Sequence, residues 1–249
     1  MNRRGMYCGI LLSVVIIVVS GIPLRETMAR ERLNGIKVCL DPGHGGFDPG
    51  AVNDAYDLRE TEINLDVAFG LQSLLEGAGA QVVLTRTDDD TYLENYDRYT
   101  FCNAETATIL VSIHTNSVVY PEWDGAMALY FRPHEDDKQL AGAIYEVMYP
   151  FLQETAPDPA AFRSFGLDWF ASGVLLRSDM PAAMMEPLFM SNPDEAALLQ
   201  VPIYQDAFVE IINPDCQDFG CRRGQIAVAI FNGILNYYAG PQAKKGLVN

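Results

Sequence analysis

The feature that most limits the fold of this chain is a regular alternation of two hydrophobic patterns. Short apolar runs rich in β-branched residues, which predict buried strands, fall at 36–40, 81–85, 108–113, 126–131, 174–176 and 182–185. Longer segments with apolar residues three and four positions apart, which predict amphipathic helices, fall at 60–78, 92–104, 137–152 and 223–238. Alternating strands and helices predict a single α/β domain, with a mostly parallel or mixed central sheet and helices on both of its faces.

The first 30 residues differ from this pattern. Arg3 and Arg4 precede an uncharged apolar stretch at 6–22, which is typical of a secretory signal or an N-terminal membrane anchor with a short linker. Basic residues ahead of such a stretch place the N-terminus in the cytoplasm and the following domain outside it. We therefore expect an exported protein, cleaved or anchored, with one folded domain at 31–240, a tail at 241–249, and membrane contact through the N-terminal segment alone.

The charge balance restricts the partners. The formal net charge is −16, which argues against nucleic acid as a partner, because phosphates need Lys and Arg.

Residues 153–172 show little periodicity and contain the aromatic residues Phe162, Phe165, Trp169 and Phe170. This segment predicts a long loop that either packs on the core or forms a lid over a cleft.

The surroundings of the cysteines indicate different roles for two pairs of them. Cys39 and Cys102 fall on apolar faces and are expected to be small core hydrophobes. Cys216 and Cys221 lie in a polar loop, where an exported domain can form a local disulfide. The chain contains no CxxC pair, so a cysteine zinc site is not expected.

Two of the three histidines directly follow predicted strands. His44 lies in the stretch DPGHGG after the run at 36–40, and His114 lies in SIHTN after the run at 108–113. Ligands and catalytic groups collect at the carboxyl ends of strands in open α/β sheets. The two histidines therefore indicate a metal site or an acid–base pair at that edge.

Two glutamates complete the candidate site. Glu60, at the start of the first predicted helix, is the expected third metal ligand; alternatively it is a carboxylate favoured by the helix dipole. Glu186 follows the run at 182–185 and is flanked by apolar residues, which suits a general base with a raised pKa. The alternative for Glu186 is a buried ion pair with Arg177.

Five separated motifs make the chain recognisable. The stretches LDPGHGG at 40–46, LRE at 58–60, TR at 85–86, VSIHTN at 111–116 and MEPLFMSNP at 185–193 occur in the order found in one enzyme family. Together they resemble the zinc-dependent N-acetylmuramoyl-L-alanine amidases of amidase type 3, over residues 35–238, nearly the whole chain after the expected export segment. The Met-Glu-Pro sequence around Glu186 departs from the family pattern, which affects the expected substrate preference.

The resemblance implies a function for the candidate site. It implies His44, Glu60 and His114 as ligands of one Zn²⁺ and Glu186 as the catalytic carboxylate. The implied reaction is hydrolysis of the amide between N-acetylmuramic acid and the L-alanine of peptidoglycan. Asn116 and Arg177 are candidate substrate-binding residues.

The sequence is also compatible with other functions. The same residues would suit a zinc peptidase that cuts within the stem peptide, or a non-catalytic protein that only binds peptidoglycan. Iron and oxygen chemistry also uses two histidines and one carboxylate, but Glu186 as an additional carboxylate favours hydrolysis. The sequence does not identify a protein regulator.

Overall fold

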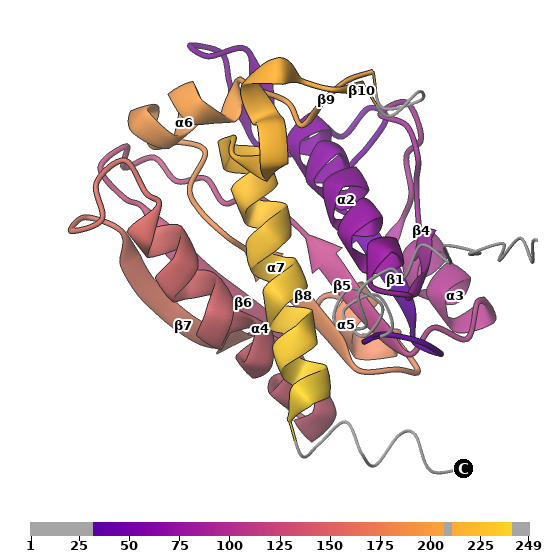
Figure 1. The fold of residues 1–249 in the computed structure, drawn as a ribbon. Coiled ribbons are helices and arrows are strands. Elements are labelled where there is room, and N and C mark those ends of the chain that lie inside the picture. The colour runs from indigo at the N-terminus through magenta and orange to yellow at the C-terminus, as the bar shows by residue number, and fades with distance from the viewer. Residues whose placement is uncertain (1–31, 207–210, 241–249) are drawn as a thin grey trace, which may run out of the picture.

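A six-stranded mixed sheet forms the centre of the molecule, in a computed structural model that describes residues 32–206 and 211–240 (Figure 1). Its strands, in spatial order, are β4 (Gln81–Leu84), β1 (Lys37–Pro42), β5 (Ile109–Ile113), β8 (Ala182–Glu186), β6 (Gly125–Tyr130) and β7 (Arg163–Trp169). Two short strand pairs lie outside it: β2 (Val52–Asn53) with β3 (Leu58–Arg59), and β9 (Tyr204–Asp206) with β10 (Ile211–Ile212).

Strand directions bring the carboxyl ends of four strands to one edge of this sheet. Strands β4, β1, β5 and β8 run parallel, whereas β6 runs antiparallel to β8 and β7 runs parallel to β6. The carboxyl ends of β1, β5 and β8 therefore lie beside the amino ends of β6 and β7. The prediction of a single α/β domain with a mixed sheet is confirmed.

Helices cover both faces of the sheet. The long helices α2 (Glu60–Gly77), α4 (Glu135–Glu154) and α7 (Arg222–Ala239) pack together on one face, as Figure 1 shows. They bury the larger hydrophobic core, to which Leu40, Leu71, Val111, Ile144 and Ile230 belong. On the other face, α3 (Asn95–Ala104) and α5 (Gly173–Arg177) cover a smaller core. The shorter helices α6 (Pro193–Leu199) and η1 (Pro214–Phe219) precede α7.

Two predictions of secondary structure were wrong. Residues 174–176, predicted as a strand, lie in α5, because Ser172 caps a helical turn there by accepting a hydrogen bond from the Val174 amide. The predicted long loop at 153–172 contains the edge strand β7 in its second half. A register shift interrupts the pairing of β7 with β6, and most side chains of β7 are exposed, so the alternation of a half-buried strand is absent.

Helix ends also differ in detail from the sequence prediction. Helix α3 begins at Asn95, three residues later than expected, because Glu94 and Asp97 form a reciprocal capping box there. Asn192 caps α6 by accepting hydrogen bonds from the amides of Asp194 and Glu195, with Pro193 in the first turn. Glu195 does not complete a capping box, because its carboxylate is paired with the buried guanidinium of Arg222.

The cysteines form two disulfides among the described residues. Cys216 pairs with Cys221, which confirms that expectation. Cys39 pairs with Cys102, which corrects their interpretation as separate core hydrophobes. Both lie on apolar faces as expected, but those faces belong to β1 and α3, which pack against each other.

The expected export segment at 1–30 and the tail at 241–249 lie outside the described residues. In the ranges that the structure describes, none of the helices combines the length and the apolar composition needed to cross a bilayer.

Candidate active site

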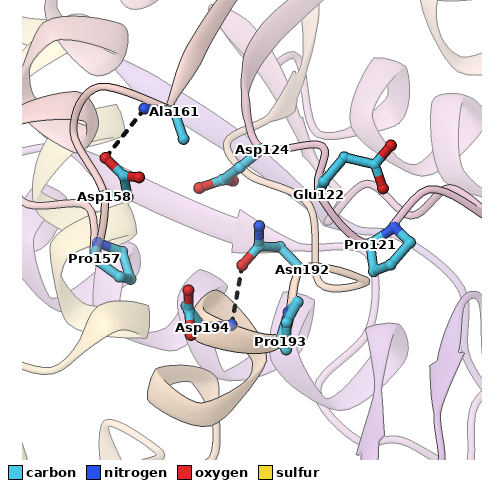
Figure 2. Close-up of a pocket in the computed structure, with 9 residues that line it drawn as sticks. All are labelled: Pro121, Glu122, Asp124, Pro157, Asp158, Ala161, Asn192, Pro193 and Asp194. Atoms are coloured by element: carbon cyan, nitrogen blue, oxygen red, sulfur yellow. Dashed lines mark hydrogen bonds between the residues drawn. The ribbon is translucent and has the colours of Figure 1, made fainter.

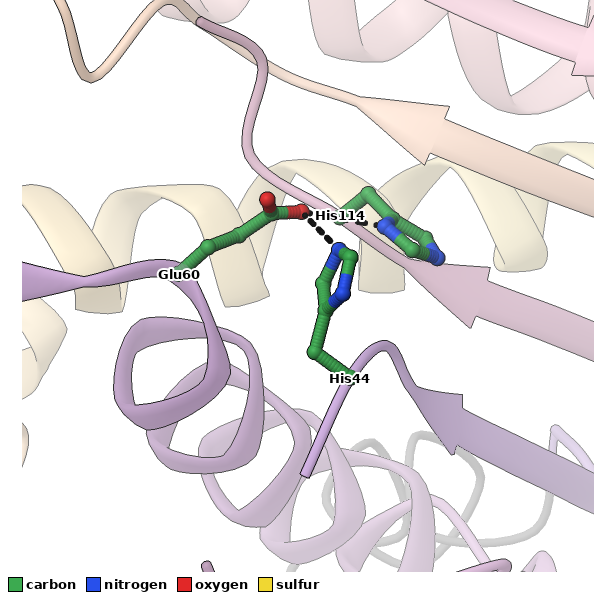
Figure 3. A group of neighbouring side chains, drawn as sticks. All are labelled: His44, Glu60 and His114. Carbon is green, nitrogen blue, oxygen red and sulfur yellow. Dashed lines mark hydrogen bonds and ion pairs between the residues drawn. The ribbon is translucent and has the colours of Figure 1, made fainter. Parts of the chain in front are cut away.

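Three of the predicted site residues converge at the carboxyl edge of the sheet (Figure 3). His44 follows β1, His114 follows β5, and Glu60 is the first residue of α2. One ligand atom from each lies within 4.8 Å of the others. The Oε1 atom of Glu60 is 3.1 Å from Nε2 of His44 and 3.0 Å from Nδ1 of His114. This His–Glu–His cluster (His44, Glu60 and His114) could hold a metal ion, and its donor set suits zinc.

The turn that carries His44 is strained and tightly constrained. His44 has a φ of 64°, a region that non-glycine residues seldom adopt and that is often found at functional sites. Its Nδ1 lies 2.9 Å from Oδ2 of Asp48, so Asp48 orients the ring and leaves Nε2 directed at Glu60. At Gly43, a Cβ atom would overlap the ring of His114, so only glycine allows this close approach.

Burial and hydrogen bonds act on Glu60 in opposite directions. Burial alone would raise its pKa, but the hydrogen bonds and charges of His114 and His44 outweigh this and hold the pKa well below its usual range. Oε2 also accepts a hydrogen bond from the amide of Ala51, at 2.9 Å, and Oε1 accepts one from the amide of Thr115, at 3.1 Å. The carboxylate is thus ionised and fixed in position, as a metal ligand requires.

A buried ionic network holds the backbone of the His44 turn. Arg98 donates hydrogen bonds to Oδ1 of Asp41 and to the carbonyl of Pro42, both at 2.9 Å, and to the carbonyl of His44 at 2.8 Å. Arg86 also donates to the carbonyls of Pro42 and Gly43, at 3.0 and 2.9 Å. The motifs that carry the resemblance contain Asp41 and Arg86 but give no structural role for either, and Asp48 was missed. A carboxylate four residues after a candidate histidine ligand was a usable signal for Asp48.

Glu186 ends β8 at the same edge as the cluster. The amide of His114 donates to the carbonyl of Met185 at 3.0 Å, which places Glu186 beside the strand that leads to His114. Its Oε2 atom is buried and has no hydrogen-bond partner. Burial first, and then the negative charge of Glu60, raise the pKa of Glu186 well above its usual value. The alternative of an ion pair with Arg177 is therefore wrong.

The two predicted substrate-binding residues lie in different places. Asn116 is half-buried beside the site, where its backbone bonds to Leu188 and Met190 and its side-chain amide donates to the sulfur of Met127 at 3.4 Å. Arg177 is exposed at the end of α5, before β8 begins, and hence toward the opposite edge of the sheet. The structure thus places Asn116, but not Arg177, near the cluster.

Two pockets open near this edge. One of about 210 Å³ contains the two histidines and is also lined by Asp48, Tyr92 and Arg98. A larger one, of about 390 Å³, is lined by four carboxylates and by neutral side chains (Figure 2). In the larger pocket, burial and the charge of Glu195 raise the pKa of Asp124 to about 7. The larger pocket is lined by no residue of the His–Glu–His cluster, whereas the smaller pocket is lined by both of its histidines. The smaller pocket is therefore the candidate active site.

Comparison with known proteins agrees with this geometry. The sequence model of a family described as N-acetylmuramoyl-L-alanine amidase matches residues 38–213. A germination-specific N-acetylmuramoyl-L-alanine amidase of Bacillus subtilis (strain 168) is 30% identical over 221 residues, which cover 83% of this chain and 81% of that protein.

Solved structures give the same result. An N-acetylmuramoyl-L-alanine amidase from Clostridium difficile 630 has a TM-score of 0.68 and 28% identity, covering 84% of this chain and 99% of that one. The CwlD amidase from Clostridioides difficile, solved in complex with the GerS lipoprotein, has a TM-score of 0.66 and 27% identity over 82% and 98% of the two chains. The chain therefore belongs to the N-acetylmuramoyl-L-alanine amidase family, whose members hydrolyse the amide between N-acetylmuramic acid and L-alanine in peptidoglycan.

Proposed function

We propose that this amidase uses one zinc ion held by His44, Glu60 and His114, and that Glu186 moves the proton in the reaction. The single observation that carries the proposal is the convergence of two imidazoles and an ionised carboxylate within 4.8 Å. The support for Glu186 is its position at the same edge, with a buried oxygen that has no partner. An unpaired buried carboxyl group costs free energy unless it is used.

The chemistry follows from these positions. A bound zinc ion would polarise the scissile carbonyl and lower the pKa of a water molecule in the site to about 7. Glu186 accepts a proton from the attacking water molecule while the oxygen of that water bonds to the carbonyl carbon. Glu186 then donates that proton to the L-alanine nitrogen as the carbon–nitrogen bond breaks, which releases a lactyl carboxylic acid and a free peptide amine. A pKa raised above its usual value makes Glu186 a stronger base for the first proton transfer.

Location is a second part of the proposal. We assign residues 1–30 to export or anchoring, residues 31–240 to the catalytic domain and residues 241–249 to a tail. Basic residues before the apolar stretch at 6–22 support action outside the cytoplasm, where peptidoglycan lies. The complex of a similar amidase with a lipoprotein supports a search for a protein regulator of this chain.

The experiment that tests the function is digestion of purified peptidoglycan by the full chain, followed by mass spectrometry of the products. Hydrolysis at the proposed bond yields glycan with a free lactyl group and an intact peptide that begins with L-alanine. Cleavage inside the stem peptide would show a peptidase, and binding without cleavage would show a non-catalytic protein. Metal analysis should find about one zinc ion per chain, and a chelator should abolish activity reversibly.

The role of Glu186 has its own test. We expect Glu186→Gln to keep its zinc and to lose about 10²-fold or more in kcat, because an amide cannot accept the proton. Glu76→Gln is a matched control, since Glu76 is an exposed residue of α2 that contacts Gln72. Loss of zinc in Glu186→Gln would make Glu186 a ligand and contradict its role as the base.

A further inference from the structure

An exposed aromatic pair lies on the rim of the zinc-site pocket. The side chain of Phe47 is 80% exposed, although it follows His44 by only three residues. Its ring stacks on Tyr92, with centroids 4.0 Å apart and an angle of 28° between the ring planes. Tyr92 itself lines the pocket that contains the two histidines. The pair therefore extends the pocket wall outward on the His44 side.

Backbone hydrogen bonds fix the turn that carries Phe47. The amide of Gly45 donates to the carbonyl of Asp48 at 2.9 Å, and the amide of Asp48 donates back to Gly45 at 3.1 Å. The amide of Gly46 donates to the carbonyl of Asp89 at 2.7 Å, which ties the turn to the segment before Tyr92. These hydrogen bonds therefore hold the backbone of the turn in a conformation that leaves the Phe47 side chain exposed. Exposed apolar groups rimmed by polar ones commonly mark binding sites.

The charge around the pair limits what can bind to it. Asp48 and Glu94 place carboxylates near Tyr92, whose hydroxyl donates a hydrogen bond to Glu94 at 2.9 Å. The neighbouring cations Arg86 and Arg98 are buried and already paired. Arg86 donates to the carbonyl of Pro42 and to the carboxylate of Asp89, and Arg98 donates to the carboxylate of Asp41. An anionic ligand, such as the carboxylates of a stem peptide, is therefore disfavoured on this rim. A neutral ligand with an apolar face is favoured.

We propose that Phe47 and Tyr92 form a stacking platform for a sugar ring of the glycan strand, on the His44 side of the cluster. This inference rests on the proposed function, because the scissile amide joins a sugar-borne lactyl group to a peptide. The C–H face of a pyranose ring carries partial positive charge and packs on the negative face of an aromatic ring. Sugar bound on this rim places the lactyl carbonyl toward the cluster and the peptide toward Glu186.

Two substrates separate this platform from other roles of Phe47. One is a disaccharide of N-acetylglucosamine and N-acetylmuramic acid that carries the stem peptide, and the other is the same peptide carrying only a lactyl group. We expect Phe47→Ala to raise KM for the disaccharide substrate about five- to tenfold with little change in kcat. KM for the sugar-free substrate should not change. Phe47→Trp should keep the KM of the original chain.

Matched controls and a binding measurement make the outcome decisive. Trp169 is another exposed aromatic residue, at the carboxyl end of β7 and so at the far edge of the sheet, and Trp169→Ala should leave both KM values unchanged. Calorimetry of the peptide-free disaccharide with the Glu186→Gln protein should show binding that Phe47→Ala weakens. The platform would be overturned if Phe47→Ala changed KM equally for both substrates. It would also be overturned if the affinity for the disaccharide were the same with and without the Phe47 side chain.

The failure of the proposed function gives a different result. In that case the original chain and the Phe47 variants would all fail to cleave either substrate, or would all cleave them without zinc. A Phe47→Ala variant that changes only the association of the protein with other proteins would assign the aromatic pair to a protein contact, and it would also overturn the platform. Zinc content measured for every variant shows whether the neighbouring His44 turn has been disturbed.

Discussion

Removal of the Cys39–Cys102 disulfide should strongly destabilise the fold. The bond joins β1 to α3, both cysteines are fully buried, and they are 63 residues apart in the sequence. Closing a loop of that length in the unfolded chain corresponds to about 4 kcal/mol at 25 °C in the chain-entropy treatment. The Cys216–Cys221 bond closes a separation of only five residues, for which the same treatment gives about 2 kcal/mol.

The assay is urea denaturation of two double variants. We expect Cys39→Ala/Cys102→Ala to lower the free energy of unfolding by about 4 kcal/mol, and Cys216→Ala/Cys221→Ala to lower it by about 2 kcal/mol. The second variant is the matched control, because it also removes two sulfur atoms. Equal losses in the two variants, or a smaller loss for the long loop, would refute the reasoning from loop length.

The Cys39→Ala/Cys102→Ala variant should retain most of its activity while it remains folded. Cys102 lies one turn after Arg98 in α3, and Cys39 lies two residues before Asp41 in β1. The three hydrogen bonds of Arg98 to Asp41 and to the carbonyls of Pro42 and His44 still connect these elements without the disulfide. We expect turnover per folded molecule to stay within a few-fold. A complete loss of zinc binding in folded protein would show that the disulfide itself holds the site.

Three further changes probe other parts of the molecule. Glu195→Ala leaves the buried charge of Arg222 without its partner and should cost about 3–5 kcal/mol in urea denaturation, whereas replacing both residues with apolar ones should cost much less; equal losses would contradict this. Because burial and Glu195 raise the pKa of Asp124 from 3.8 to about 7, its contribution to stability is present below pH 3.8 and is lost as the pH rises through 7. Asp124→Asn should flatten that decline in stability, and a flat profile for the original chain would refute it. Gly43→Ala should displace the ring of His114 and lower zinc content in metal analysis, while unchanged zinc binding would refute the steric argument.

The sequence could predict the convergence of the site because of a topological rule. Buried strands are recognisable as apolar runs, and parallel strands that alternate with helices end at the same edge of a sheet. His44 after β1, His114 after β5 and Glu186 at the end of β8 were therefore expected at one edge, and the strand order puts β1, β5 and β8 next to each other. The distances within the cluster could not be predicted, because they depend on the turn conformation at His44.

The features that sequence reasoning missed depend on contacts between distant segments. Cys39 and Cys102 each have an apolar setting, and only the packing of α3 on β1 brings their sulfurs together. The segment 174–176 has the composition of a strand, but the cap provided by Ser172 and the packing of α5 against α3 favour a helix. The edge strand β7 is exposed and irregular, so its sequence carries no strand periodicity.

The two halves of the proposed site are held in different ways, and this bears on how each can change. Glu186 belongs to β8, a strand paired on both sides, so its position is set by the central sheet. His44 lies on a turn whose carbonyls are held by Arg86 and Arg98, and Phe47 extends from that same turn. A substitution at 47 can therefore alter the wall that meets the sugar while the position of Glu186 stays fixed. We infer that substrate preference can vary on the His44 side of the site without loss of the proton-transferring group.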